Sequence, residues 1–334
     1  MAYESDQTTV QERSSLFAEL EEYEEMEELT GWRRNLQLWR GRLAEQWSIL
    51  TEDRLVVTAM GVFGFFAFLA VFAPYLAPFG PTERLYQSDG VLIAKWMDPA
   101  ILGGQSKFIL GTSASGYDIF SQLIWGARPT LIVGIVAASL TVGVGTIIGL
   151  LAGYYGGYVD DFLMRLVDFV YGMPLLPTVV VFVSLMGPGF ENIIIALVLL
   201  QWRTSARVIR SQVLSVRERP YIQAARVAGA SDWRIISRHI TPNVLPLSLL
   251  YAAFAMAWAI LTEAGVSFLG LGDPSQISWG VMLQNARTYS AVVEGAWWWF
   301  IPPGVCISLV VISGFLIGRG YEKIVNPELQ SESV

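Results

Sequence analysis

The sequence has very few of the residues on which metal and nucleophile chemistry depends. It contains one cysteine, Cys306, and one histidine, His239, in 334 residues. A disulfide within the chain is therefore impossible, and so is a zinc site built from several cysteines and histidines. Lysine is also scarce, and no G-x-x-x-x-G-K-[ST] sequence is present. The chain cannot bind ATP through a P-loop of its own.

Charged residues are also scarce. Charged residues make up 15% of the chain and hydrophobic residues 53%, whereas soluble domains carry about 25% charged residues. This composition excludes an ordinary soluble enzyme. The net charge of −7 belongs to the N-terminus, because residues 1–30 hold ten acids and one base, which leaves +2 for the remainder. No long basic face is left over, so nucleic acid is not an expected partner.

The distribution of charge predicts five regions. Residues 1–30 form an acidic cytoplasmic tail, and residues 31–54 an amphipathic helix at the membrane interface, because tryptophan and leucine recur there every three or four residues with arginines between them. Residues 55–128 hold the first span and an external loop, 129–325 a core of five spans, and 326–334 a second cytoplasmic tail. The first apolar run starts late, so we expect no signal peptide.

Six runs with little or no charge approach the roughly 20 residues that cross a bilayer. The fourth run is the shortest, because arginines interrupt it early. The side chains of these arginines can snorkel to the interface. The predicted spans are 55–76, 131–154, 169–190, 192–208, 240–262 and 295–318. Prolines are expected to kink the third span at Pro174 and Pro177 and the sixth at Pro302 and Pro303. Three consecutive tryptophans, 297–299, predict an aromatic belt at the interface.

The arginines predict the orientation. Eight of them lie between Arg203 and His239, against two acids, and such a loop belongs in the cytoplasm. Counting spans outward places both termini in the cytoplasm and residues 77–128 outside. We therefore expect a multi-pass protein of the cell membrane, in contact with membrane lipid.

One loop, residues 220–242, carries most of the functional information. Small residues at 224, 225, 228 and 229 share a helical face, where another backbone can approach closely. Gly229 can adopt positive φ and end a first helix, while Ser231 is a candidate N-cap with Asp232 in the first turn of a second. This pattern favours docking on another protein. A loop packed only on its own subunit is the alternative.

The loop resembles the cytoplasmic EAA motif of ABC importer permeases, E-A-A-x3-G-x9-I-x-L-P. Four positions match directly, namely Ala224, Ala225, Gly229 and Pro242. Three depart: Gln223 replaces the glutamate, His239 stands at the isoleucine position and Thr241 replaces the leucine. Gln223 puts in doubt any ion pair that the glutamate of the motif makes.

The resemblance extends over about residues 55–325. The stretches 109–134, 149–169, 220–242 and 261–283 are similar, in order and spacing, to the second permease subunit of dipeptide/oligopeptide importers. The resemblance implies an all-α membrane protein with six transmembrane helices, a type I ABC importer permease with cytoplasmic coupling helices. It also implies a non-catalytic subunit.

The same resemblance implies partners. They are a sister permease subunit, two ABC ATPase subunits that bind the ATP, and an external substrate-binding protein; this chain itself needs no cofactor or metal. The residues expected to couple the loop to an ATPase are Gln223, Ala224, Ala225, Ala228, Gly229, Ser231, Asp232, Arg234 and Pro242.

Glu263 is the candidate for the translocation pathway or outer gate. It is the only acid between Ile240 and Asp273 and is expected near the outer end of the fifth span. A hydrated or capped interfacial carboxylate is the other interpretation.

Other substrates and functions remain open at this point. Permeases of this kind also transport metal chelates or oligosaccharides. A stand-alone secondary transporter would need ionisable residues in mid-membrane or repeat symmetry, and an intramembrane enzyme would need a catalytic constellation in the spans.

Overall fold

The computed structural model describes residues 47–84, 96–103 and 106–325. The chain divides into two units, 1–53 and 54–334, and the first is described only by a short helix at 47–52 and the residue after it. The predicted acidic tail, most of the amphipathic helix and the tail 326–334 lie outside the described residues.

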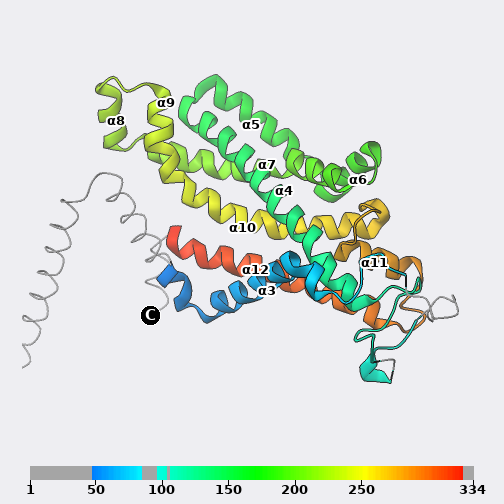
Figure 1. Cartoon of the computed structure of the whole chain (residues 1–334). Helices are drawn as coiled ribbons and strands as arrows, with labels where there is room; N and C mark the ends of the chain where they lie inside the picture. Colours follow the sequence, from blue (N-terminus) through cyan, green and yellow to red (C-terminus); the bar gives the residue numbers. More distant parts are fainter. Residues whose placement is uncertain (1–46, 85–95, 104–105, 326–334) are drawn as a thin grey trace, which may run out of the picture. The chain divides into compact units, whose positions relative to one another are not determined.

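The second unit is a bundle of helices, and its described residues contain no strand (Figure 1). Its α-helices are α3 (Arg54–Leu76), α4 (Ile119–Tyr155), α5 (Gly157–Tyr171), α6 (Leu175–Met186), α7 (Phe190–Arg217), α8 (Pro220–Val227), α9 (Asp232–Ile235), α10 (Thr241–Val266), α11 (Trp279–Thr288) and α12 (Ile301–Val325). Four short helical turns join them: η1 (Ala100–Leu102), η2 (Ile236–Ile240), η3 (Ser267–Leu271) and η4 (Trp297–Trp299).

Five helical stretches of the described chain are long and apolar enough to cross a membrane. They contain α3, α4, α7, α10 and α12, and the bent pair α5 and α6 makes a sixth span if it is counted as one. The predicted all-α fold with six spans is confirmed on that count. The bounds of α3 agree closely with the predicted first span.

The third predicted span is wrong as a single kinked helix. Instead, α5 ends at Tyr171, α6 begins at Leu175, and the two axes differ by 88°. Pro174 is the N-cap of α6 with extended backbone, φ −66° and ψ 123°. Proline disfavours helical backbone in the residue before it, so the helix stops here instead of bending. Pro177 lies in the first turns of α6, where its missing N–H breaks no helical hydrogen bond.

Two helices begin at other residues than predicted. Helix α4 starts at Ile119, twelve residues before the predicted start of the second span, because the Asp118 carboxylate caps it by accepting the Ser121 amide at 2.8 Å. Helix α12 starts at Ile301, so Pro302 and Pro303 occupy its first turn and do not kink it.

The predicted tryptophan belt is wrong for two of its three members. Trp298 and Trp299 are only 5% and 2% exposed and belong to the core that joins α4, α10, α11 and α12. The Trp299 ring stacks on Tyr289 with centroids 5.8 Å apart. Only Trp297 keeps a partly exposed ring. Cys306 is buried in the same core, as the packing interpretation predicts.

Helices α4 and α7 pack with almost no space between their backbones. Three glycines on one face of α4, at 145, 149 and 153, meet α7. A Cβ atom added to Gly149 would lie 2.7 Å from the Ala206 carbonyl oxygen and 2.9 Å from the Arg210 amide nitrogen. Such a small-xxx-small stripe allows close helix contact in membranes. The two helices therefore form one tightly fitted pair.

Candidate functional site

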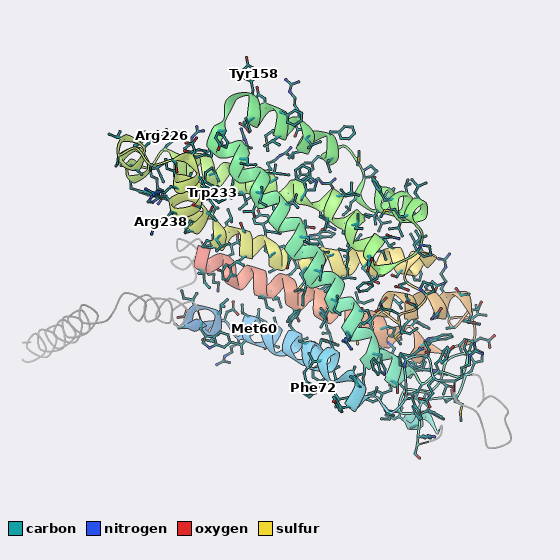
Figure 2. The ribbon with its side chains drawn as sticks, turned by 45° about the horizontal axis from the view of Figure 1, so that its top comes forward. Met60, Phe72, Tyr158, Arg226, Trp233 and Arg238 are labelled. Carbon is teal, nitrogen blue, oxygen red and sulfur yellow. The ribbon has the colours of Figure 1, made fainter. Side chains whose placement is uncertain are left out.

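The candidate site is the α8–α9 segment, residues 218–240, which connects α7 to α10. In Figure 1 it lies at one end of the bundle, away from α11. Figure 2 shows Arg226, Trp233 and Arg238 on this segment, at the end of the bundle that also carries Tyr158 of α5. The segment is a helix–glycine–helix, as predicted.

Helix α8 ends in a left-handed glycine turn. Pro220 occupies its first position, and Gly229 follows its C-terminus with φ +80°. The Gly229 amide donates to the Arg226 carbonyl at 3.0 Å, and the Ala230 amide donates to the Ala225 carbonyl at 3.1 Å. This pair of hydrogen bonds is the Schellman pattern, which needs positive φ at the glycine. The predicted role of Gly229 in the turn is confirmed.

Helix α9 starts where predicted but has no side-chain cap. Ser231 has the extended backbone of an N-cap, yet its side chain makes no capping hydrogen bond. The neighbouring Asp232 carboxylate instead accepts the Tyr154 hydroxyl at 2.6 Å. Tyr154 lies 78 residues earlier, near the end of α4. The contact ties the second helix of the segment to α4.

Buried isoleucines hold the segment to the bundle. Ile222 of α8 and Ile235 of α9 are fully buried, and Ile240 of η2 joins them. They pack in one apolar cluster with Val213 and Val216 of α7. One apolar side of each short helix is therefore fixed, which leaves its other side outward.

The outward side combines small residues with large apolar ones. Val227 is 90% exposed and Trp233 is 76% exposed, although both are apolar. Among the residues predicted to couple, those exposed are Gln223, Ala224, Ala228, Gly229, Ser231, Asp232, Arg234 and Pro242, while Ala225 is partly buried. The sequence pattern did not single out Val227 or Trp233, because the burial of a single apolar residue in a short polar helix cannot be read from the sequence.

Arginines of α7 form hydrogen bonds and ion pairs with the neighbouring helices α4 and α5. Arg217 donates to the carbonyls of Gly153 and Tyr154, at 2.9 and 3.2 Å, and so satisfies two carbonyls at the end of α4. Arg210 pairs with Asp160, and Arg207 with Asp168, both on α5. The sequence predicted these arginines only as markers of orientation; their partners lie too far along the chain to be found from spacing.

A polar recess of about 360 Å³ lies beneath the segment. Its walls come from the ends of α4 and α7 and from α8 and α9. It is lined by Tyr154, Tyr155, Arg217, Glu218, Gln223, Arg226 and Asp232. Because charges of both signs line the recess, it favours neither anions nor cations. Within the described residues, no group of His, Cys, Asp and Glu is placed to hold a metal ion.

Glu263 is buried in the protein, so the hydrated interpretation is wrong. Its side chain is 1% exposed, and its Oε1 accepts the hydroxyls of Ser267 at 2.7 Å and Ser278 at 2.9 Å. Ser278 is in turn the N-cap of α11, accepting the Val281 amide at 3.2 Å. Glu263 therefore joins the end of α10 to the start of α11 through Oε1, while its Oε2 is buried with no hydrogen-bond partner among the described residues.

A second cavity, of about 440 Å³, lies within the bundle. Side chains of α4, α7, α10 and α12 line it, with Leu175 from the start of α6. Aromatic rings of Tyr251, Phe254 and Trp258 line it, together with Gln201 and Arg203 of α7. The cavity is thus mainly apolar, with a few polar groups and one cation.

Several long apolar helices, with a polar segment at one end of the bundle, indicate an integral membrane protein. Residues 145–331 match the family described as the inner membrane component of binding-protein-dependent transport systems. Residues 41–93 match the N-terminal transmembrane domain of oligopeptide transport permease C. The chain therefore belongs to the family of inner membrane permease components of binding-protein-dependent transport systems, as the resemblance implied.

Two relatives that are similar in sequence agree with this family. The di/tripeptide transport system permease protein DppC of Pseudomonas aeruginosa is 33% identical over 290 residues, which cover 86% of this chain and 93% of the relative. The glutathione transport system permease protein GsiD of Pectobacterium atrosepticum is 31% identical over 321 residues, 96% of this chain and 98% of the relative. A solved structure of the inward-facing MetNI methionine ABC transporter aligns with a TM-score of 0.49 at 19% identity, covering 62% of this chain and 95% of that chain.

Proposed function

We propose that this chain is a permease subunit of an ATP-driven, binding-protein-dependent importer of peptides. Relatives named for dipeptides, tripeptides and glutathione support this substrate class. The chain would pair with a sister permease, receive peptide from an external binding protein and work with two ATPase subunits. Metal chelates and oligosaccharides are the competing substrates.

The observation that carries the proposal is the exposed apolar face of the α8–α9 segment. Val227 and Trp233 project from a segment that is polar and fixed to the bundle by its opposite side. Large apolar side chains that are exposed beside small residues are suited to be covered by a partner protein. We assign the ATPase to this surface, with Gln223, Ala224, Ala228 and Arg234 in contact. ATP would bind only to the partner, since this sequence has no P-loop.

Glu263 would then act at the opposite end of the membrane. It joins the end of α10 to the N-cap of α11. We propose that this connection positions α11 as part of the outer gate, and that the 440 Å³ cavity lies on the translocation pathway. Glu263 would act through α11 and not by binding peptide, because its carboxylate is fully enclosed.

The orientation is proposed with both termini and the α8–α9 segment in the cytoplasm. Single cysteines at the exposed positions Ile101 and Tyr158 test it, since the native Cys306 is buried. Tyr158 lies at the end of the bundle that carries the α8–α9 segment but outside the proposed ATPase surface (Figure 2). A membrane-impermeant maleimide should label Ile101→Cys in intact cells and Tyr158→Cys only in inverted vesicles. The opposite labelling pattern would contradict this orientation.

Two experiments test the function. Affinity purification of the tagged chain should recover a sister permease and two P-loop ATPases in fixed ratio; recovery of the chain alone would contradict the proposal. Uptake of labelled dipeptides, tripeptides, a maltose oligomer and a metal chelate should then be compared between the deletion strain and the complemented strain. Loss of peptide uptake alone is expected. Loss of uptake of the sugar or the chelate instead would reassign the substrate.

A further inference from the structure

We propose that Tyr154 is the positioning residue that transmits movement of the α8–α9 segment to the α4–α7 helix pair. The proposal rests on the proposed function, in which an ATPase moves this segment. Tyr154 touches neither ATP nor peptide, and it acts through Asp232. Its loss should separate ATP hydrolysis from transport without preventing assembly.

The contact has the geometry of a specific link. The Tyr154 hydroxyl donates to Asp232 Oδ1 at 2.6 Å, and the Tyr154 side chain is buried. The Arg226 guanidinium of α8 lies 6.0 Å from the centre of the same ring. Both short helices of the segment therefore meet one aromatic side chain of α4. A hydrogen bond to a carboxylate is stronger than one between neutral groups.

The helix that carries Tyr154 is rigidly fitted to its neighbour. Gly149 and Gly153 bring the backbones of α4 and α7 into contact, with no room for a Cβ atom. Arg217 of α7 holds the carbonyl of Tyr154 itself at 3.2 Å. A displacement of the Tyr154 hydroxyl is thus passed to both helices, because packed interiors transmit strain instead of absorbing it.

The other contacts of the segment with α4 are less directional. Gly229 forms the turn between α8 and α9 and has no neighbouring atom within 4 Å of where a Cβ would stand. Helix α9 continues through η2 into α10 as one helical stretch, Asp232–Leu271, so its movement also reaches α10. The isoleucine cluster joins the segment to α7 and includes Leu150 of α4, but apolar contacts have little directionality. The Tyr154–Asp232 hydrogen bond supplies the directional connection to α4.

The test uses the whole transporter purified with its partners and reconstituted into proteoliposomes. Five variants are compared with the wild type. Tyr154→Phe, Asp232→Ala and the double variant of the two remove the link, Asp232→Asn keeps an oxygen that accepts the hydroxyl, and Tyr155→Phe is the matched control. Tyr155 is the next residue and lines the same recess, and no hydrogen bond of its hydroxyl is found among the described residues. The measured quantity is ATP hydrolysed per labelled dipeptide imported, per assembled complex.

We expect Tyr154→Phe and Asp232→Ala each to raise this ratio by about threefold or more, the factor that one hydrogen bond of this kind supports. The double variant should be no worse than either single one, because both remove the same contact. Asp232→Asn accepts only a neutral hydrogen bond, so its ratio should fall between those of the wild type and Asp232→Ala. Tyr155→Phe should stay close to the wild type. This pattern would not arise if Tyr154 only stabilised the fold.

Other outcomes overturn the proposal. An unchanged ratio in Tyr154→Phe does so, and so does a loss of assembled protein with a normal ratio in the molecules that remain. Failure of the proposed function gives a different result, because wild-type proteoliposomes would then show no ATP-dependent import at all. The two failures are therefore distinguishable in one set of measurements.

Discussion

At the scale of single residues, Gly229 shows why a residue type is required at one position. Its φ of +80° is strained for any residue with a Cβ atom, while the space around it within the chain is open. The sequence suggested two reasons for glycine, the left-handed turn and the close approach of a partner. Within this chain only the first applies.

Gly229→Leu is therefore expected to reach normal membrane levels but to lose uptake. Leucine strains the turn by roughly 1 kcal/mol or more, and its side chain projects where the ATPase is proposed to dock. Gly229→Asn is the control, because asparagine tolerates left-handed backbone better. Uptake and copurified ATPase are measured per inserted molecule. Normal values for the leucine variant would exclude this segment as the connection to the ATPase.

Asp118 provides a pH-dependent prediction. Its carboxylate caps α4, and burial raises its pKa above the ordinary 3.8, although the hydrogen bonds from Ser121 act in the opposite direction. A carboxyl whose pKa is raised on folding favours the folded state below its unfolded pKa. That contribution is lost as the pH rises through the folded pKa.

The detergent-solubilised wild type should accordingly lose stability relative to Asp118→Asn as the pH is raised from about 4 to neutrality. Asparagine remains a good N-cap and carries no charge to desolvate. Melting curves at several pH values measure the difference. A gap between the two proteins that does not vary with pH would contradict the assignment.

At the scale of elements, the contact between α4 and α7 dominates the bundle. Its three glycines follow one another at intervals of four, a pattern that favours close helix contact but does not specify the partner helix. The break between α5 and α6 cannot be predicted from the sequence for another reason. Pro174 indicated a disturbance of the helix, and only tertiary packing decides whether a proline bends a helix or ends it.

Gly149→Ala tests the fit of the two helices. The added Cβ would meet backbone atoms of α7 at 2.7 and 2.9 Å, which cannot move as a side-chain tip can. We expect a destabilisation of about 1–3 kcal/mol, seen as less folded protein in the membrane. Gly143→Ala is the matched control, because Gly143 lies on the same helix with no atom within 4 Å. Equal levels of the two variants would show that the helices are less tightly fitted.

At the scale of the whole molecule, the sequence was sufficient for the fold class, the family and the place of the α8–α9 segment. Charge-free runs count the spans, and the Gly229 turn follows from the one residue type that adopts positive φ readily. Contacts between residues far apart in the chain could not be predicted from the sequence. Tyr154 and Asp232 are 78 residues apart, and Glu263 meets Ser278 only because α11 folds back on α10. No local pattern encodes such pairs.

The central claim is that this chain imports peptide only when a partner ATPase moves it. The most direct test is import of a labelled dipeptide into proteoliposomes that contain the purified transporter, with external binding protein and enclosed ATP. The account predicts accumulation that needs the ATP and the binding protein and is unaffected by proton or sodium gradients. Accumulation driven by an ion gradient in the absence of ATP would contradict it.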